Sequence, residues 1–509
     1  MNVQRVMLSN AKRSFASSAS RFQGATASKT AAAPQPEPAQ PPQPVEMRRA
    51  GPTHPLGHPT ETGTGRSSAN AATSQTRGQK GSMPNIVLVE GVRTPFLMSG
   101  TQYKNLMPHD LQRQAILSLL RRTEFPVEKI DYVIMGTVIQ EAKTSNIARD
   151  ASLGAGISER TPAHTVTMAC ISSNQAITTA MGLIGTGQMD AIICGGVDFM
   201  SDVPIRFSRK MRQAMLNLNK AKTLPAKLGV VSKMLKPSIW APELPAIAEF
   251  TSGETMGHSA DRLAAAFGIT RKESDEYAAR SHHLAAEATK NGMLKEIEPF
   301  KVPGVPDVVT ADNGIRVSTL EALSKLKPAF VKPYGTVTAA NASYLTDGAS
   351  ASLIMSEEAA LAMGYKPKAY LRHYTYVSQD PVDQLLLGPA YAAPNVLAKA
   401  GLTIDDIDVF EFHEAFAGQI LANLKALDSD FFAREYMKKD SKVGAPPMEK
   451  FNKWGGSLSI GHPFGATGVR LATVTANRLI AEDGRFGLLA ACAAGGLAHA
   501  MVVERYPGS

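Results

Sequence analysis

The feature that most constrains the fold is a regular alternation of short apolar strands with helical stretches. Strands are indicated at 85–90, 130–139 and 190–194, and a helix at 173–185 lies between the second and the third. Strands that alternate with helices predict an α/β fold whose sheets are largely buried.

The same pattern occurs again in the second half of the chain. Residues 404–412 have the pattern of residues 127–135, and each half ends with an apolar strand that runs into a Gly pair. We interpret this as an internal duplication of about 150 residues. A chance similarity between two α/β halves is the alternative that sequence alone leaves open.

One segment interrupts the alternation. Residues 203–325 begin rich in Lys, Arg and Met and continue with helical patterns, so we predict an inserted, mostly helical loop domain. The insertion divides the N-terminal domain into residues 84–202 and 326–360. The C-terminal domain is then expected at 361–509.

The first 83 residues differ from the rest in composition. Residues 1–36 contain no Asp or Glu, and Arg5, Lys12 and Arg13 with apolar neighbours allow a basic amphipathic helix. This pattern predicts a mitochondrial transit peptide, with a disordered basic tail as the alternative. Residues 37–83 are rich in Pro, Gln, Gly, Ser and Thr and are expected to be a disordered linker.

Charge and cysteine content exclude several classes of protein. The net charge of +9 arises mainly in the N-terminal arm, where residues 1–81 hold 10 basic and 3 acidic residues, and no nucleic-acid-binding module accompanies it. Three cysteines give neither a disulfide framework nor metal-ligand spacing, so we expect a reducing compartment and no metal site. The uncharged run 486–503 is just long enough for a membrane span, but its Gly pair favours two buried strands joined by a turn.

Two cysteines and two histidines lie in turns suited to chemistry. Cys170 precedes the predicted helix at 173–185, where the helix dipole is expected to lower its pKa. His462 lies in a Gly-rich turn, where it is a natural base for a thiol. His413 follows the apolar strand 407–412 at its carboxyl end, and Cys492 precedes Gly495-Gly496.

Taken together, these motifs resemble those of the thiolase family over roughly residues 84–507. The matching segments are Arg93-Thr94-Pro95, Cys170-Ile-Ser172, Gly335 to Ala349, His413-Glu414-Ala-Phe416, Gly461-His462-Pro463 with Gly465-Ala-Thr-Gly468, and Cys492-Ala-Ala494-Gly-Gly. The resemblance implies the thiolase fold, in which two duplicated halves form α/β/α/β/α layers. The chain resembles the mitochondrial long-chain branch of the family at three positions. Most thiolases have Asn in place of His413 and Gly in place of Ala494, and many have Gly in place of the aromatic residue after Ser343.

The resemblance also implies a mechanism. Cys170 would attack the 3-keto carbon of a 3-ketoacyl-CoA after His462 takes its proton, and Cys492 would protonate the acetyl-CoA enolate. His413 and His462 would stabilise the enolate oxygen, and the N–H groups of Cys170 and Ala494 would hold the other oxyanion. The methyl group of Ala494 requires an allowed φ.

The remaining site assignments are less direct. Glu414 would orient neighbouring groups or cap a helix, and sequence does not separate these roles. By resemblance, Ser343 would line the pantetheine path, and Met256 and His258 would lie near the acyl pocket, with simple packing as the alternative. No metal or redox cofactor is implied, because coenzyme A is a substrate.

The start of the insertion is basic and amphipathic. Apolar residues recur at 224, 228, 231 and 235, which is one helical face, and residues 206–236 contain nine Lys and Arg residues. Such a helix is typical of binding to an anionic membrane surface. A helix that covers the enzyme's own core, or a patch for the phosphates of CoA, are the alternatives.

The resemblance implies thiolytic cleavage of long-chain 3-ketoacyl-CoA, the last step of mitochondrial fatty acid β-oxidation. The resemblance implies a homodimer within a hetero-oligomer that contains a hydratase/dehydrogenase α-subunit, on the matrix side of the inner membrane. A short-chain acetoacetyl-CoA thiolase and a non-catalytic membrane scaffold are the alternatives.

Overall fold

The computed structural model describes residues 84–245 and 248–509. The predicted transit peptide at 1–36 and the predicted linker at 37–83 lie outside the described residues. The first strand begins at Ile86, close to the expected start of order.

The N-terminal half is built on a mixed sheet in the order β4-β3-β5-β8-β1. Strands β3, β4 and β5 are parallel to one another, whereas β8 is antiparallel to both β5 and β1. The strands are β1 (Ile86–Arg93), β3 (Tyr132–Gly136), β4 (Ala163–Val166), β5 (Ala191–Asp198) and β8 (Thr346–Ser356).

The C-terminal half repeats this arrangement with one strand fewer. Its order β10-β11-β12-β9 has the directions of β3-β5-β8-β1, with one parallel pair followed by two antiparallel pairs. The two halves join where β1 pairs with β9 over two residues. This equivalence in order and direction supports the predicted duplication. The strands are β9 (Ala369–Ser378), β10 (Val409–Phe412), β11 (Phe486–Ala493) and β12 (Leu497–Arg505).

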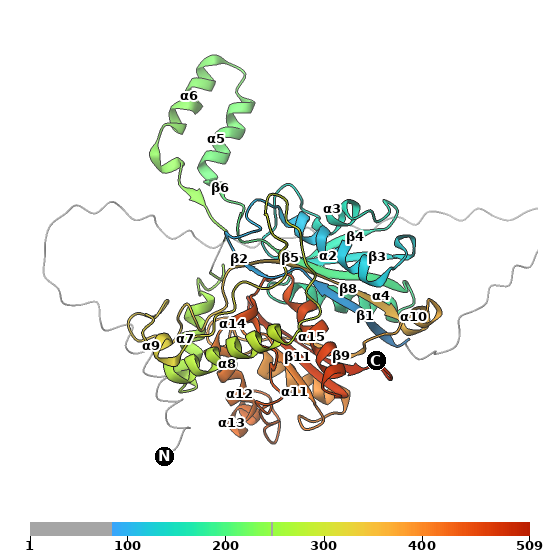
Figure 1. Cartoon of the computed structure of the whole chain (residues 1–509). Coiled ribbons are helices and arrows are strands. Elements are labelled where there is room, and N and C mark those ends of the chain that lie inside the picture. The colour runs from blue at the N-terminus through green and yellow to red at the C-terminus, as the bar shows by residue number, and fades with distance from the viewer. Residues whose placement is uncertain (1–83, 246–247) are drawn as a thin grey trace, which may run out of the picture. The chain divides into compact units, whose positions relative to one another are not determined.

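Helices complete the five layers of the expected α/β/α/β/α arrangement (Figure 1). Helices α2 (Pro108–Thr123) and α3 (Ile147–Gly154) pack on the outer side of the first half, and α11 (Gly388–Ala400) and α12 (Ala417–Leu427) on that of the second. The middle layer is α4 (Ser172–Gly185) against α15 (Thr467–Ala481), around one apolar core of Ile, Leu, Val and Ala side chains. Shorter elements are β2 (Leu97–Met98), η1 (Val127–Lys129), α10 (Glu357–Ala362), α13 (Asp430–Glu435) and α14 (Ser457–Ile460).

The uncharged run 486–503 forms the antiparallel pair β11 and β12, as predicted. Their central residues are buried on both faces of the sheet, which explains a continuous apolar run in place of alternation. Within residues 84–245 and 248–509, no helix has the length and apolar character needed to cross a membrane.

The inserted segment lies between β5 and β8 and has two parts. The first is a helical hairpin of α5 (Arg209–Lys220) and α6 (Leu224–Met234), whose small core contains Met211 and Ala214 and which stands apart from the layers in Figure 1. It is flanked by β6 (Arg206–Phe207), η2 (Pro237–Ile239) and β7 (Pro242–Glu243). The second part comprises α7 (Met256–Ala266), α8 (Arg271–Lys290) and α9 (Leu320–Ser324), and α7 and α8 pack on α12 of the C-terminal half. The domain boundaries themselves stay predictions.

Three glycines bring the two halves into close contact beside the middle layer. A Cβ atom at Gly196 would overlap the carbonyl oxygen of Gly465 and lie 2.7 Å from that of Gly136. Backbone atoms cannot move aside as a flexible side chain can, so a larger residue at 196 would push the halves apart.

We therefore expect Gly196→Ala to lower the free energy of unfolding by about 3 kcal/mol, at or above the usual cost of overpacking. Gly182→Ala is the matched control, because Gly182 is exposed on α4 and its Cβ would meet nothing within 4 Å. Replacing a helical glycine in open space should stabilise by roughly 0.5–1 kcal/mol. Denaturant unfolding measures both, and equal midpoints for the two variants would contradict the close contact.

Candidate active site

The predicted reactive residues come from both halves and meet beside the middle layer. Cys170 lies in the turn between β4 and α4, and His413 directly follows β10. His462 lies in the turn before α15, and Cys492 is the penultimate residue of β11. Each half thus contributes a turn that precedes a helix of the middle layer.

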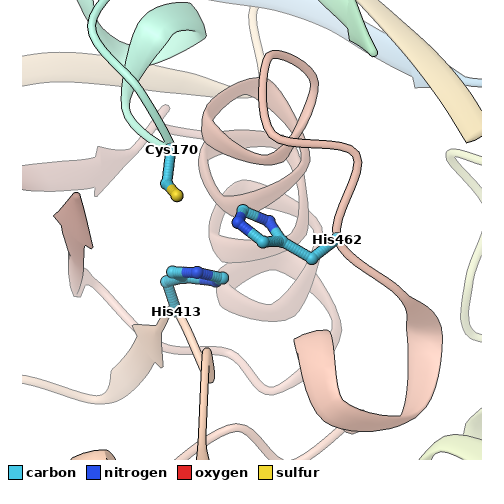
Figure 2. Close-up of side chains that lie close together, drawn as sticks. All are labelled: Cys170, His413 and His462. Carbon is cyan, nitrogen blue, oxygen red and sulfur yellow. The ribbon is translucent and has the colours of Figure 1, made fainter. Parts of the chain in front are cut away.

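Cys170, His413 and His462 form a compact cluster (Figure 2). One side-chain ligand atom from each lies within 4.8 Å of the others, and the two imidazole centroids are 4.0 Å apart. Both histidines are buried, and neither Nε2 atom has a hydrogen-bond partner among the described residues. Buried polar atoms without a partner are rare, so the cluster is suited to binding a polar group between them.

The backbone around Cys170 is unusual. Ala169 has a φ of 47°, a left-handed conformation that costs energy in a residue with a Cβ atom. The hydroxyl of Ser172 supports this turn, because it accepts from Met168 N at 2.8 Å and donates to Ala169 O at 2.7 Å. The turn thereby presents Cys170 two residues before the start of α4.

The charge state of Cys170 differs from the expectation. Burial raises the pKa of its thiol to about 12, and this outweighs the backbone N–H of Ala494, which lowers it. The predicted lowering by the helix dipole is therefore wrong in its net direction, since loss of solvent is the larger effect. Cys170 is a thiol at neutral pH and needs a base.

His462 has hydrogen bonds that fit a neutral imidazole able to accept a proton. Its Nδ1 lies 2.7 Å from the hydroxyl of Thr467, and this hydroxyl donates its only proton to Pro463 O at 3.0 Å. With the hydroxyl of Thr467 donating to Pro463 O, its oxygen accepts from Nδ1–H, and this assignment leaves a lone pair on Nε2 of His462. Burial, followed by the neighbouring His413 and Arg470, lowers the pKa of His462 well below 6.5, which keeps this lone pair free at neutral pH.

His413 has the opposite tautomer. The hydroxyl of Ser457 accepts from Arg470 Nη2 at 2.8 Å and lies 2.9 Å from His413 Nδ1. Among the hydrogen bonds of the described chain, Nδ1 is the only acceptor for the Ser457 proton, so His413 carries its own proton on Nε2. Burial and then Arg470 lower the pKa of His413 to about 3. The site therefore contains one neutral imidazole that accepts and one that donates.

The buried guanidinium behind this pair is itself held in place. Arg470 on α15 contacts Glu411 at 3.4 Å, and Glu411 also pairs with Arg478 at 2.8 Å. All three side chains are fully buried, where a charge is stable only when paired. Sequence analysis did not single out Ser457, Thr467 or Arg470, since nothing in their spacing shows which ring nitrogen they contact.

Cys492 and Ala494, at the end of β11 and in the turn after it, also act on Cys170. The thiol of Cys492 is buried, and burial followed by the charge of Cys170 raises its pKa, which places the two cysteines within electrostatic range. The backbone N–H of Ala494 lowers the pKa of the Cys170 thiol, though by less than burial raises it. Ala494 is not among the residues with positive φ, so its methyl group is compatible with the turn.

Glu414 supports the site without facing it. Its buried carboxylate accepts from Tyr277 at 2.8 Å, Ser281 at 2.8 Å and Asn452 at 2.7 Å, and from Leu458 N at 3.3 Å. Leu458 belongs to α14, the segment that carries Ser457. Because Leu458 is the second residue of α14, these contacts fit both roles that sequence left open, and the role of Glu414 stays a prediction.

Asp198 connects the His462 turn to the first half. Its carboxylate at the end of β5 accepts from Val138 N, Ile139 N and Gly465 N, the last at 2.5 Å. Burial raises the pKa of Asp198 to about 7 despite these donors. Sequence analysis missed this residue, because one Asp at a strand end has no recognisable signature.

The three predicted substrate-binding residues are less closely grouped. Ser343 donates its backbone N–H to Ala415 O at 2.9 Å, and its neighbours Ala342 and Tyr344 line a cavity of about 270 Å³. Met256 begins α7 and packs on the apolar core of the C-terminal half. His258 is half-exposed and lies 2.6 Å from Glu254. Their roles in substrate binding stay predictions.

The chain belongs to the thiolase family. Residues 86–358 match the family model described as thiolase, N-terminal domain, and residues 365–505 match thiolase, C-terminal domain. The solved structure of a Bacillus anthracis acetyl-CoA acetyltransferase has a TM-score of 0.72 at 30% identity, and human mitochondrial 3-ketoacyl-CoA thiolase has 0.71 at 29%. Each alignment covers 84% of this chain and all of the other. The predicted family and fold are confirmed.

Two curated relatives are much more similar in sequence. The human trifunctional enzyme subunit beta, mitochondrial, is 68% identical over 428 residues, which cover 84% of this chain and 90% of the relative. A probable 3-ketoacyl-CoA thiolase from Caenorhabditis elegans is 62% identical over 448 residues, covering 88% and 98%.

Proposed function

We propose that this chain is a 3-ketoacyl-CoA thiolase, an acetyl-CoA C-acyltransferase that cleaves its substrate with coenzyme A. The observation that carries the proposal is the cluster of one thiol and two neutral imidazoles with opposite tautomers. Thiolysis needs a base for the nucleophile and a donor for the developing oxyanion, and the two Nε2 atoms supply these. The names of the relatives and of the solved structures agree with this reaction.

In the first half-reaction, the proton of Cys170 passes to Nε2 of His462, and the sulfur attacks the 3-keto carbon. The bond between C2 and C3 then breaks, which leaves an acyl group on Cys170 and an acetyl-CoA enolate. The Nε2–H groups of His413 and of the protonated His462 face the enolate oxygen, and Cys492 gives its proton to C2.

In the second half-reaction, the Cys492 thiolate takes the proton of an incoming CoA. The CoA thiolate attacks the acyl carbon, the bond from that carbon to the Cys170 sulfur breaks, and His462 returns its proton to Cys170. The product is an acyl-CoA that is two carbons shorter. The backbone N–H groups of Cys170 and Ala494 hold the oxyanion of the tetrahedral intermediate. The lowering of the Cys170 pKa by the Ala494 N–H supports this role for Ala494.

We propose that the reaction uses no metal ion and no cofactor. Cys170, His413 and His462 are close enough to hold a soft metal, but each has a proton-transfer or hydrogen-bonding role in the steps above. Dialysis against a chelator should therefore leave kcat unchanged. A loss that zinc restores would show that the cluster works as a metal centre.

We propose long-chain 3-ketoacyl-CoA as the preferred substrate and mitochondrial β-oxidation as the setting. The support is the 68% identity to relatives that are named mitochondrial. The test compares cleavage of four-carbon and sixteen-carbon 3-ketoacyl-CoA by the purified chain. Faster cleavage of the longer substrate is expected, whereas activity restricted to the shorter one would favour an acetoacetyl-CoA thiolase.

We propose that the α5–α6 hairpin binds an anionic membrane surface on the matrix side of the inner membrane. The apolar face predicted from sequence is exposed, with Leu224 at 70%, Leu228 at 60% and Leu235 at 77%. It does not cover the enzyme's own core, which removes one alternative. Of the nine basic residues, only Arg206 and Arg212 pair with an acid, namely Glu243, among the described side chains.

The membrane proposal predicts that Lys227→Glu with Lys233→Glu weakens binding to vesicles that contain anionic lipid. Each lysine near such a surface contributes about 1 kcal/mol, so the pair should reduce binding at least tenfold. Lys272→Glu on α8 is the control, because Lys272 is exposed and lies outside the hairpin. Vesicle binding that is the same in all variants would leave a protein partner as the occupant of this face.

Two partners remain proposals. The names of the relatives support assembly with a hydratase/dehydrogenase α-subunit, and the thiolase family supports a homodimer. The half-buried edge strand β4 has one side without a paired strand in the described chain, as a pairing with a second copy would require.

A wild-type chain that forms no acyl-enzyme would support the alternative of a non-catalytic membrane scaffold.

A further inference from the structure

The turn at 493–496 carries the Ala494 N–H and joins β11 to β12, which pair up to Ala493 and Leu497. Gly495 and Gly496 have φ of 86° and 70°, and neither has a side chain that could pack. The backbone of the turn makes a hydrogen bond with Gln379, the residue after β9, whose N–H donates to Gly496 O at 2.8 Å. It makes another with Glu249, whose carboxylate accepts from Gly495 N at 2.7 Å. In the described chain, Glu249 is the only side chain that hydrogen-bonds the backbone of this turn.

The backbone of Glu249 is held by hydrogen bonds within its own loop. Its backbone N–H donates to Glu254 O at 2.8 Å, and its carbonyl accepts from Gly253 N at 2.7 Å. Glu254 in turn contacts His258 at 2.6 Å and Arg262 at 3.1 Å, both on α7. The carboxylate is therefore presented from a compact loop that is tied to α7.

The charge of Glu249 opposes what a nucleophilic thiol needs. Burial is the main cause of the raised pKa of Cys170, and the charges of Asp198 and Glu249 raise it further. Asp198 has a clear structural role, because it binds three backbone N–H groups. Glu249 accepts a hydrogen bond from one backbone N–H group, that of Gly495, which follows Ala494.

We propose that Glu249 is a positioning residue, which holds the 493–496 turn so that the Ala494 N–H is directed at the sulfur of Cys170 and at the oxyanion formed there. The proposal rests on the proposed thiolase function and adds a residue from the insertion to its machinery. The insertion thereby reaches the reacting atoms through one charge-assisted hydrogen bond.

The test compares Glu249→Ala with Glu249→Gln in the full chain. Glu249→Gln keeps an acceptor oxygen for Gly495 N–H but removes the charge, so its kcat should stay within about twofold of wild type. Glu249→Ala loses the acceptor, and kcat should fall about tenfold, as expected for the loss of one hydrogen bond, with little change in KM. Glu276→Ala, on the exposed side of α8, is the control for removal of a carboxylate.

A second readout separates positioning from folding. The rate at which iodoacetamide alkylates Cys170 at fixed pH should rise in both Glu249 variants, because both remove a negative charge near the thiol. A loop that simply unfolds would lower the thermal midpoint and the yield of acyl-enzyme in both variants together.

Three outcomes would overturn the proposal. They are full kcat in Glu249→Ala, an equal loss of kcat in Glu249→Gln, and a loss that follows the thermal midpoint. A wild-type chain that neither turns over nor forms an acyl-enzyme would overturn the thiolase function as well. An active wild type beside an equally active Glu249→Ala would overturn the role of Glu249 alone.

Discussion

Cys170→Ala should reduce kcat for 3-ketoacyl-CoA cleavage by about 10⁴-fold or more, since removal of a nucleophile from a catalytic group that acts as a unit has effects of this size. The variant also cannot form an acyl-enzyme, which mass spectrometry of the wild type incubated with acyl-CoA should detect on the peptide that contains Cys170. Because Ala169 and Ser172 shape the turn through their backbone and hydroxyl groups, the fold should tolerate the change.

Cys194→Ala is the matched control. Cys194 is fully buried in β5, and its sulfur donates to Ala176 O at 3.4 Å, away from the reactive cluster. We expect normal kcat and a modest loss of stability. Acylation that persists in Cys170→Ala and disappears in Cys492→Ala would reverse the two cysteine roles.

His462→Gln should lower kcat/KM by about 10²- to 10⁴-fold at pH 7, the usual contribution of a general base. It should also change the pH dependence. With the pKa of the Cys170 thiol raised to about 12, the fraction of thiolate without a base grows about tenfold for each pH unit below that value. Residual activity of the variant should therefore climb steeply between pH 7 and 9, whereas the wild type, which has a neutral imidazole throughout this range, should not.

Thr467→Val provides the graded comparison. It removes the acceptor for His462 Nδ1–H but keeps the imidazole, so a loss of about tenfold is expected, equivalent to one hydrogen bond. A pH profile of His462→Gln parallel to that of the wild type would show that another group takes the Cys170 proton.

Much of this architecture was predictable because it depends on local pattern. The strands at 130–139 and 190–194 and the helix at 173–185 were found within a few residues of β3, β5 and α4. The duplication was visible because equivalent elements in the two halves carry the same apolar pattern. The proximity of Cys170, His413 and His462 could be predicted because ligands of α/β folds bind at the carboxyl ends of strands, while their catalytic roles stay predictions.

The parts that were missed depend on contacts between distant segments. The pKa of Cys170 was predicted in the wrong direction, because the helix dipole is visible in sequence whereas burial is not. The tautomers of His413 and His462 depend on single hydroxyl protons of Ser457 and Thr467, which no spacing rule reports. Glu249 lies 246 residues from its partner Gly495, in a segment without a motif.

The matching topology of the two halves has a consequence for how such a site can originate. Cys170 and His462 occupy equivalent turns, each leading into the helix that packs on its counterpart in the middle layer. A gene that encoded one half could only assemble a symmetric pair with identical residues in both turns. Such a pair would contain two thiols or two imidazoles, but not the one thiol and one imidazole that the reaction needs. When both copies are part of one polypeptide, the two turns can change independently. One turn can then carry a thiol and the other an imidazole.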